Sequence, residues 1–294
     1  MSFKNKYSSD DYANIQYINS GSHGQIYTAY DKTLKSTIVI KQIKKMKIGN
    51  KITNENEILN EVEILTHLST VCSKNMLCYI DYKEDDDFFY IITEHLGKHI
   101  LLSKISQLTL SNDDLIKMIE NLKIGLYDIH NAGVAHRDIK PDNIMVNPFT
   151  MDIKYIDFGL SCLANQCKQG DQGTPLYMAP EILNGHSPND FDSWKQADYW
   201  SLGVTILGIQ CDRPFVVYYG NMIKQTPVDD IHELKYVINN GINNKMDNGM
   251  DISVFKIHNM MTYPRNKFIH KYLLETVFPL ISGKIGKRRL ILPF

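Results

Sequence analysis

Apolar and polar residues alternate over two short stretches near the start of this 294-residue chain. Residues 13–18 and 25–30 each show a period of two, which is typical of half-buried strands, and a turn with two glycines separates them. Residues 37–41 form an apolar run that ends in lysine, and two more strand patterns, at 76–82 and 88–93, flank an acidic turn. The first third of the chain is therefore predicted to form strands joined by short turns.

The spacing of apolar residues changes to a helical period in three places. Residues 58–68 have this spacing on a background of strong helix formers. Residues 113–130 are also helical in pattern, with Ser111 or Asn112 as the N-cap. Residues 198–204 open an apolar helix. Helices are therefore expected both between the strands and after them.

Composition narrows the class of protein. Hydrophobic residues make up 43% of the chain and charged residues 22%, which is typical of a globular protein. The formal net charge of −1 gives no support for nucleic-acid binding. The N-terminus lacks the apolar run of a signal peptide, and no segment is long enough to span a membrane. Five scattered cysteines without a C-x-x-C pair predict reduced thiols in an intracellular, cytoplasmic protein. An oligomeric state is not indicated.

The residues best suited to chemistry lie between 130 and 159. Two carboxylates, Asp138 and Asp157, and the amide of Asn143 stand on loops that short apolar runs bracket. Lys140 follows the first carboxylate by two residues. This combination suits a site that holds a divalent metal ion and takes a proton from an attacking hydroxyl group.

These segments resemble the catalytic and metal-binding loops of a eukaryotic-type protein kinase, in its serine/threonine form. The sequence His-Arg-Asp ends at Asp138, Asp-Phe-Gly begins at Asp157, and residues 173–181 match the family pattern G-T-P-x-Y-M-A-P-E. Seven matched segments in the right order make a chance match implausible. A metal-hydrolase site at His136 and Asp138 is poorly supported, because no third ligand lies near them in the sequence.

The resemblance implies an α+β fold with two lobes, an N-terminal antiparallel sheet with one long helix and a mainly helical C-terminal lobe. The expected divisions are a flexible N-terminus at 1–11 and a kinase domain at 12–294, made of an N-lobe (12–94), a hinge (95–97) and a C-lobe (98–294).

The resemblance also implies roles for single residues. Asp138 would accept or orient the substrate hydroxyl, Lys140 would offset charge on the γ-phosphoryl group, and Asn143 and Asp157 would bind the metal. Lys41 would contact the α- and β-phosphates and would be held by Glu61, since Glu63 lies on another face of the helix. The ATP-binding set comprises Asn19, Gly21, Gly24, Ile26, Val39, Lys41, Thr93, Glu94 and Leu96. Asn19 stands where the family has the first glycine of its phosphate loop.

Regulation is expected to involve Arg137, which often pairs with a phosphate on the activation segment in this family. The usual phosphate acceptor position falls near Asp171, where the chain has no Ser, Thr or Tyr. Asp171 is therefore interpreted as a fixed negative charge for Arg137, and Thr174 as part of the substrate pocket. The basic cluster at 287–289 is interpreted as an ion-pair partner of Glu181 or as a solvated end.

The function expected from this resemblance is transfer of the ATP γ-phosphate to Ser or Thr hydroxyls of protein substrates. ATP and Mg²⁺ are the expected cofactors, with Mn²⁺ as an alternative ion. One alternative is a pseudokinase or scaffold that binds nucleotide or a partner without catalysis, which the missing first glycine favours. A second is a small-molecule phosphotransferase, which the segment at 173–181 disfavours because that segment serves as a platform for protein substrates.

Overall fold

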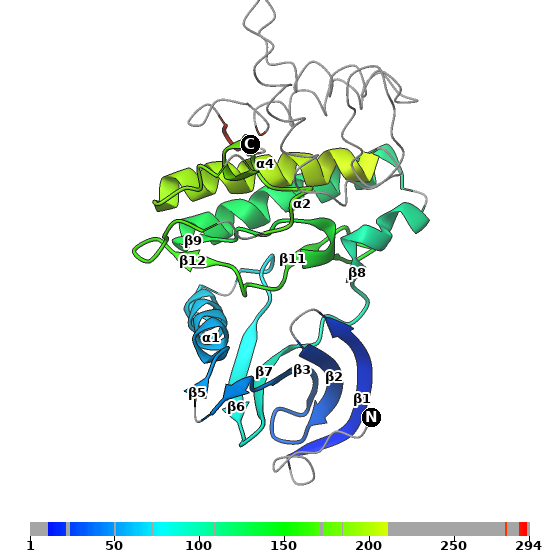
Figure 1. The fold of residues 1–294 in the computed structure, drawn as a ribbon. Helices are drawn as coiled ribbons and strands as arrows, with labels where there is room; N and C mark the ends of the chain where they lie inside the picture. Colours follow the sequence, from blue (N-terminus) through cyan, green and yellow to red (C-terminus); the bar gives the residue numbers. More distant parts are fainter. Residues whose placement is uncertain are drawn as a thin grey trace, which may run out of the picture. The chain divides into compact units, whose positions relative to one another are not determined.

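The computed structural model divides the chain into two compact units, residues 1–98 and 99–294, and each is described by itself (Figure 1). The residues that the structure describes are 11–21, 24–49, 51–71, 73–108, 110–170, 173–183, 185–210, 280 and 288–292. No helix in these ranges is long and apolar enough to cross a membrane.

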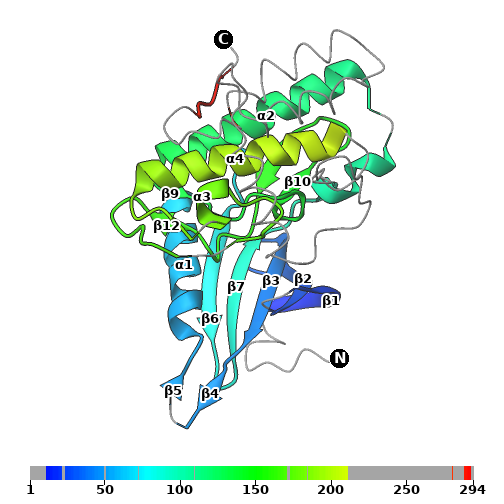
Figure 2. The same ribbon diagram turned by 45° about the horizontal axis from the view of Figure 1, so that its top comes forward.

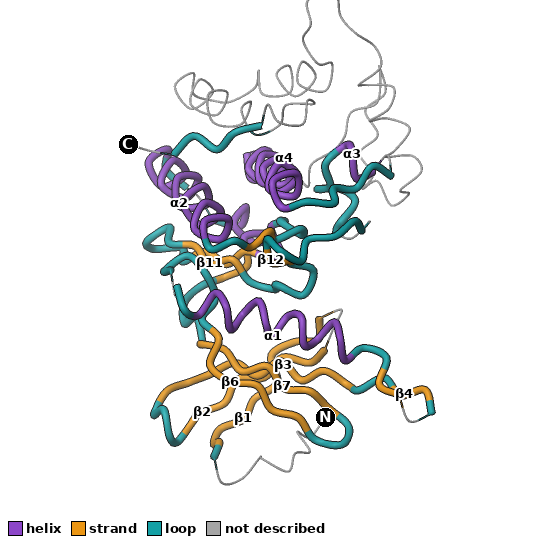
Figure 3. Tube along the Cα trace, turned by 90° about the vertical axis from the view of Figure 1, so that its left-hand side faces the viewer, coloured by secondary structure: helices purple, strands orange, loops and turns teal. Residues whose placement is uncertain are grey.

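An antiparallel sheet dominates the first unit, with the strand order β1-β2-β3-β7-β6. Its strands are β1 (Tyr12–Gly21), β2 (Gly24–Asp31), β3 (Ser36–Lys44), β6 (Tyr79–Glu84) and β7 (Phe88–Glu94). A small hairpin of β4 (Lys47–Ile48) and β5 (Lys51–Ile52) precedes α1 (Glu55–Ser69). Figure 3 shows α1 crossing one face of the sheet. The predicted sheet and long helix are confirmed.

The two faces of this sheet differ because side chains alternate along a strand. One face carries a core of buried apolar side chains: Tyr12, Tyr27, Ala29, Ile38, Ile40, Tyr90 and Ile92. Residues at the intervening positions of β2, β3 and β7 point to the other face, and α1 buries Ile64, Leu65 and Leu68 there. The period-two pattern thus assigns every side chain of the central strands to one face or the other.

The second unit contains two long helices, α2 (Asn112–Asn131) and α4 (Phe191–Gln210), which lie side by side (Figure 2). Ser111 caps α2 by accepting a hydrogen bond from the backbone N–H of Asp114, whose carboxylate accepts one in return from the backbone N–H of Ser111. Of the two predicted N-caps, Ser111 is the correct one. α4 begins at Phe191, seven positions before the predicted opening at Asp198, because the side chain of Asp190 accepts a hydrogen bond from the Ser193 N–H at this end.

Short strands and turns connect these helices. They are β8 (Ile100–Leu101), η1 (Leu102–Gln107), β9 (Val134–Ala135), η2 (Pro141–Asn143), β10 (Ile144–Val146), β11 (Ile153–Tyr155), β12 (Cys162–Leu163) and α3 (Pro180–Leu183). β10 pairs with β8 and β11, and β9 pairs with β12. The sheet in the first unit and the helices in the second confirm the predicted α+β class.

A glycine allows α2 to lie close to β11, the strand that leads to Asp157. A Cβ atom at Gly125 would lie 2.8 Å from the Tyr155 ring and 2.9 Å from the Ile153 side chain. The Tyr155 hydroxyl donates a hydrogen bond to the Leu122 carbonyl at 2.9 Å, so this ring has little freedom to move away. The contact fixes the distance between α2 and β11.

Replacing this glycine tests the contact. Gly125→Ala is expected to lower the free energy of unfolding by about 1–2 kcal/mol, because overpacking of the Tyr155 ring exceeds the gain of about 1 kcal/mol in helix propensity. Urea-induced unfolding measures the change. Tyr127→Ala, on the exposed side of α2, is the control and should change the free energy by less than about 0.5 kcal/mol. A Gly125→Ala protein as stable as the parent would contradict this contact.

Candidate functional site

One buried carboxylate holds the backbone of the loop that carries His136, Arg137 and Asp138. The Oδ2 atom of Asp198 accepts hydrogen bonds from the backbone N–H of His136 at 2.8 Å and pairs with Nε2 of His130 at 2.9 Å. Its Oδ1 atom accepts from the backbone N–H of Arg137 at 2.8 Å. Arg137 has a φ of 68°, a left-handed conformation that is rare for this residue type. Asp198 therefore stabilises a strained loop from the adjacent helix α4.

The histidine of this loop is structural. His136 is fully buried and its ring lies 5.0 Å from the ring of Phe158. Its Nδ1 atom accepts from the backbone N–H of Asp138 at 3.3 Å, and its Nε2 atom contacts the Ile156 carbonyl at 3.2 Å. Among the described residues, no three His, Cys, Asp or Glu side chains gather as a metal site. His136 thus ties the Asp138 loop to the Asp157 loop, and the metal-hydrolase interpretation gains no support.

Three side chains converge on the carboxylate of Asp138. The Thr174 hydroxyl donates to Oδ1 at 2.8 Å, and Lys140 and the amide nitrogen of Asn143 each donate to Oδ2 at 2.8 Å. Lys140 also donates to the Thr174 hydroxyl oxygen at 2.8 Å. Asp138, Lys140 and Thr174, which the sequence predicted to share one site, therefore lie in direct contact. The arrangement holds an anionic acceptor against an aliphatic hydroxyl group.

Asn143 and Asp157 lie on adjoining loops. The backbone N–H of Ile156 donates to the Asn143 carbonyl at 2.9 Å, so Asp157 directly follows a residue bonded to Asn143. Both side-chain hydrogen bonds of Asn143 use its amide nitrogen, which leaves the amide oxygen directed elsewhere. Asp157 has a φ of 60°, the second left-handed residue of the site. One carboxylate and one amide oxygen suit a hard divalent cation that completes its shell with phosphate and water.

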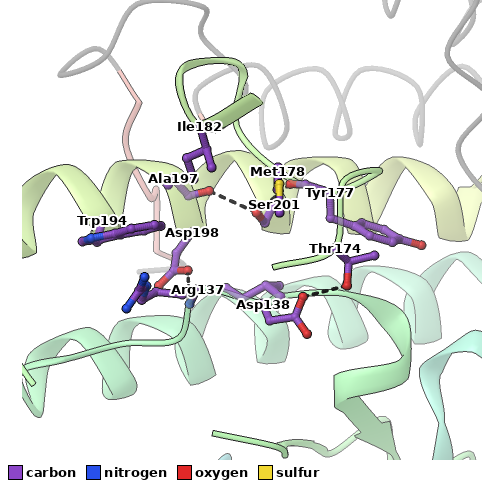
Figure 4. Close-up of a pocket in the computed structure, with 11 residues that line it drawn as sticks. Arg137, Asp138, Thr174, Tyr177, Met178, Ile182, Trp194, Ala197, Asp198 and Ser201 are labelled. Atoms are coloured by element: carbon purple, nitrogen blue, oxygen red, sulfur yellow. Dashed lines mark hydrogen bonds between the residues drawn. The ribbon is translucent and has the colours of Figure 1, made fainter. Parts of the chain in front are cut away.

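Arg137 points away from Asp138 and lines a small pocket together with Trp194 (Figure 4). Its guanidinium carbon lies 4.1 Å from the centre of the Trp194 ring, a cation–π contact. Burial lowers the pKa of Arg137, and the Asp198 charge opposes this shift. Tyr177 lines the same pocket, and burial raises its pKa to about 12, so its hydroxyl is neutral near pH 7.

In the first unit, four of the residues predicted to bind ATP lie on one face of the sheet. Ile26 pairs with Lys41 across β2 and β3, and Val39 pairs with Thr93 across β3 and β7. Paired residues share a face, and Val39 and Lys41 are two positions apart on β3. These side chains therefore point away from the apolar core, to the face that α1 covers in part.

Lys41 and Glu61 form the expected ion pair. The Lys41 ammonium lies 2.7 and 2.9 Å from the two Glu61 oxygens, and only 6% of the Glu61 side chain is exposed. Glu63 is exposed on another side of α1, as the helical spacing predicted. The pair fixes the position of the lysine ammonium on the face that carries Ile26, Val39 and Thr93.

The predicted phosphate loop is described at its two ends. Gly21 pairs with Gly24 at the tip of the β1–β2 hairpin, while Ser22 and His23 lie outside the described residues. A Cβ atom at Gly24 would overlap the Gln42 carbonyl oxygen, so this position requires glycine. Asn19, at the position of the missing first glycine, accepts a hydrogen bond from the Ser20 N–H through its side chain.

Glu94 is the last residue of β7, and the predicted hinge follows it. The backbone N–H of Glu94 donates to the Cys78 carbonyl at 3.0 Å, and the Glu94 side chain accepts from the Cys78 N–H at 2.8 Å. Gly97 has a φ of 59° and lies in the turn that follows Leu96. Glu94 and Leu96 are the residues whose backbone groups the adenine-binding prediction concerns.

The prediction of reduced thiols is wrong for two of the cysteines. Cys162 and Cys167 form a disulfide within the described structure. The turn that follows β12 brings them together, because the N–H groups of Gln166 and Cys167 both donate to the Leu163 carbonyl. Cys78 carries a thiol. Asp171, the proposed charge for Arg137, lies outside the described residues.

The basic cluster contributes an ion pair. The Arg288 guanidinium donates to both oxygens of Glu181, at 2.6 and 2.8 Å, and only 2% of Arg288 is exposed. Arg288 also donates to the Gln196 carbonyl at 3.0 Å. The interpretation as an ion-pair partner of Glu181 is therefore confirmed for Arg288. The pair ties the segment at 173–183 to α4.

A model of the protein kinase domain matches residues 12–274 of the chain. The chain belongs to the protein kinase family. This confirms the resemblance that the sequence motifs indicated, and it covers both units of the structure.

Similar proteins include several serine/threonine kinases. The probable serine/threonine-protein kinase fhkB of Dictyostelium discoideum is 31% identical over 215 residues, which cover 70% of this chain and 18% of that protein. Serine/threonine-protein kinase 33 of Mus musculus is 30% identical over 211 residues, which cover 67% of this chain and 41% of that protein. Calcium-dependent protein kinase 4 of Plasmodium falciparum is 30% identical over 203 residues, which cover 67% of this chain and 37% of that protein. The chain thus spans less than half the length of these relatives.

Three residues that hold the site of this kinase were missed as functional candidates. His130 and Asp198 appeared only as helix positions, and Trp194 gave no signal. Burial lowers the pKa of His130, and the Asp198 charge opposes that shift, so the contact joins a carboxylate to an imidazole that is neutral near pH 7. The sequence did contain one signal for Asp198: an aspartate within a segment predicted to form an apolar helix. A charge buried in such a helix needs hydrogen-bond partners.

Asp198→Asn tests how Asp198 holds the loop that carries His136, Arg137 and Asp138. The amide retains one acceptor atom but turns the other into a donor that faces an N–H group, and each buried group left without a partner costs about 1–3 kcal/mol. The free energy of unfolding is expected to fall by about 3 kcal/mol, and the amides of His136 and Arg137 should exchange hydrogen faster. Hydrogen exchange with mass spectrometry measures the exchange of these two amides.

The matched control is Asp192→Asn on the same helix, where 85% of the carboxylate side chain is exposed. Its effect on stability should stay below about 0.5 kcal/mol. Equal effects of the two substitutions would show that Asp198 does not hold the loop.

Proposed function

We propose that this chain is a serine/threonine-protein kinase that transfers the γ-phosphate of ATP to Ser or Thr hydroxyls of protein substrates. The observation that carries the proposal is the Asp138 carboxylate, bonded at once to a hydroxyl, an ammonium and an amide. Family membership supports the reaction class. The names of the similar proteins support Ser and Thr as acceptors.

Asp138 would accept the proton of the attacking hydroxyl or orient that hydroxyl. Thr174 illustrates the contact: its own aliphatic hydroxyl donates to Oδ1 of Asp138 at 2.8 Å. A substrate serine or threonine carries the same group and would compete for, or share, this acceptor. Lys140, bonded to both residues, would place its positive charge beside the transferred phosphoryl group.

Members of the family use ATP with a divalent metal ion, and we assign Mg²⁺ here, with Mn²⁺ as the alternative. Asn143 and Asp157 would hold the ion through their oxygens, which match its preference for hard ligands. When bound, the ion neutralises charge on the phosphate groups. The hydrogen bond from Asn143 to Asp138 would couple the position of the ion's amide ligand to the position of the base.

The face of the first unit that carries Ile26, Val39, Lys41 and Thr93 would bind ATP. Lys41, fixed by Glu61, would contact the α- and β-phosphates, and the backbone at Gly21 and Gly24 would approach phosphate oxygens without a Cβ atom in the way. Backbone groups of Glu94 and Leu96 would bind adenine. We also propose an intracellular location, in keeping with a nucleotide-dependent reaction.

Phosphate transfer from γ-labelled ATP to a library of Ser- and Thr-containing peptides tests the proposal. Asp138→Asn removes the charge that draws the hydroxyl proton, so kcat/KM is expected to fall by roughly 10²- to 10⁴-fold. The matched control is Asp113→Asn on the exposed start of α2, which should retain full activity. Nucleotide binding by each variant is measured separately.

The outcomes separate kinase from pseudokinase. Transfer that disappears in Asp138→Asn while nucleotide binding persists supports the proposal. Nucleotide binding with no transfer above the Asp138→Asn level would favour the pseudokinase instead. Transfer to small alcohols and never to peptides would favour a small-molecule phosphotransferase.

Activity without phosphorylation of the activation segment is a further expectation. Arg137, the residue that would pair with such a phosphate, is stacked on Trp194, and Thr174 is bonded to Asp138. Protein from bacteria, treated with phosphatase and shown by mass spectrometry to carry no phosphate between 157 and 181, should keep its activity within about twofold. Loss of activity on phosphatase treatment would contradict this expectation.

A further inference from the structure

The disulfide between Cys162 and Cys167 lies in the segment that follows Asp157. It closes a six-residue loop whose turn is also held by backbone hydrogen bonds to the Leu163 carbonyl. A cross-link over so short a loop removes little entropy from the unfolded chain, compared with one that spans most of a domain. Its effect on the molecule is therefore local and falls on residues 161–168.

The Cys162 end of this loop is joined to the catalytic loop. Cys162 pairs with Ala135 in the β12–β9 ladder, and β9 runs directly into His136. The Ser161 hydroxyl donates to the His136 carbonyl at 3.1 Å, and the Ala164 N–H donates to the Gly133 carbonyl at 2.8 Å. Residues on both sides of Cys162 thus contact the strand or loop that precedes Asp138.

The Cys167 end is joined to α4. The indole N–H of Trp194 donates to the carbonyl of Lys168 at 3.2 Å, and the Trp194 ring supports the Arg137 guanidinium at 4.1 Å. Trp194 is fully buried. The disulfide therefore links two anchors of the same catalytic loop: β9 through Cys162, and Arg137 through Lys168 and Trp194.

The disulfide is buried, but the residues that flank its cysteines along the chain are exposed. Cys162 and Cys167 are 5% and 8% exposed, whereas residues 164–166 and 168–169 are exposed. Disulfides of intracellular proteins are more often transient and redox-sensing than structural. In the intracellular location proposed above, this pair matches a regulatory disulfide better than a permanent one.

We propose that Cys162–Cys167 is a reversible redox site that controls phosphoryl transfer by ordering residues 161–168, the disulfide form being the more active. The inference rests on the proposed kinase function. A low-molecular-weight or protein thiol is the reductant: its thiolate attacks one sulfur, which gives a mixed disulfide and releases the other cysteine as a thiolate. A second thiolate then attacks the reductant's sulfur in the mixed disulfide, which forms the reductant disulfide and releases the remaining cysteine. Two thiols lose two electrons and form one disulfide, while Cys162 and Cys167 gain two electrons and two protons.

The test uses the whole chain in dithiothreitol buffers of graded reduction potential. Acid quenching, alkylation and mass spectrometry report the thiols at 162 and 167, and hydrogen exchange reports the amides of 163–168. Peptide phosphorylation is measured on the same samples. Reduction is expected to speed exchange at 163–168 by roughly tenfold and to lower kcat/KM by roughly three- to tenfold, with one midpoint for all three signals.

Variants separate this pair from other cysteines. Cys167→Ser should show the activity of the reduced protein at every potential. Cys78→Ser, which alters a thiol in the first unit, should respond to dithiothreitol as the parent does. Trp194→Phe keeps a ring beside Arg137 but lacks the N–H that binds Lys168, so it should weaken the effect of reduction on activity.

The outcomes distinguish this inference from the proposed function. Transfer activity that is identical in the oxidised and reduced protein would overturn the redox site and leave the kinase function intact. Two free thiols at 162 and 167 at every potential would also overturn it. A third outcome is that reduction speeds exchange at 163–168 in a protein that shows no transfer activity in either state. That result would overturn both the kinase function and the redox control of transfer. Only the ordering of residues 161–168 by the disulfide would then remain.

Discussion

A single buried carboxylate sets the geometry of the loop that carries His136, Arg137 and Asp138. Asp198 accepts the N–H groups of His136 and Arg137 and contacts His130, and it is 1% exposed. A buried charge is stable only when hydrogen-bond partners surround it, and the charge in turn holds those partners in place. Arg137 has a left-handed conformation within this contact, and the Arg137 and Asp138 side chains lie against different partners, Trp194 and Thr174.

The Asp138 side chain is held in turn by neighbours from two segments. Lys140 and Asn143 come from η2 and the residue that precedes it, and Thr174 comes from the segment that contains Glu181. Reaction rates depend on such prior organisation, because groups that are already in place need no reordering during the reaction. The proposed redox pair would act on this same organisation from the β12 side.

Much of this protein could be predicted from its sequence. The period-two pattern located β1 and β2, an apolar run located β3, and the helical period located α1 and α2, because the spacing of apolar residues records which side of an element is buried. The pairing of Lys41 with Glu61 also followed, since helix geometry turned Glu63 to another side of α1. Motif order gave the family and the residues around Asp138. These inferences depend on local spacing or on matched segments, and both can be read directly from the sequence.

Tertiary structure alone decided the contacts between distant positions. Asp198 lies 61 residues beyond Arg137, and Arg288 lies 107 beyond Glu181. Side chains that meet through packed helices and loops leave no periodic trace in the sequence, because their distance in space is set by the fold and not by the spacing along the chain. The disulfide was hidden for a different reason. Its cysteines are close in sequence, but only the turn after β12, paired to β9, brings Cys162 and Cys167 together.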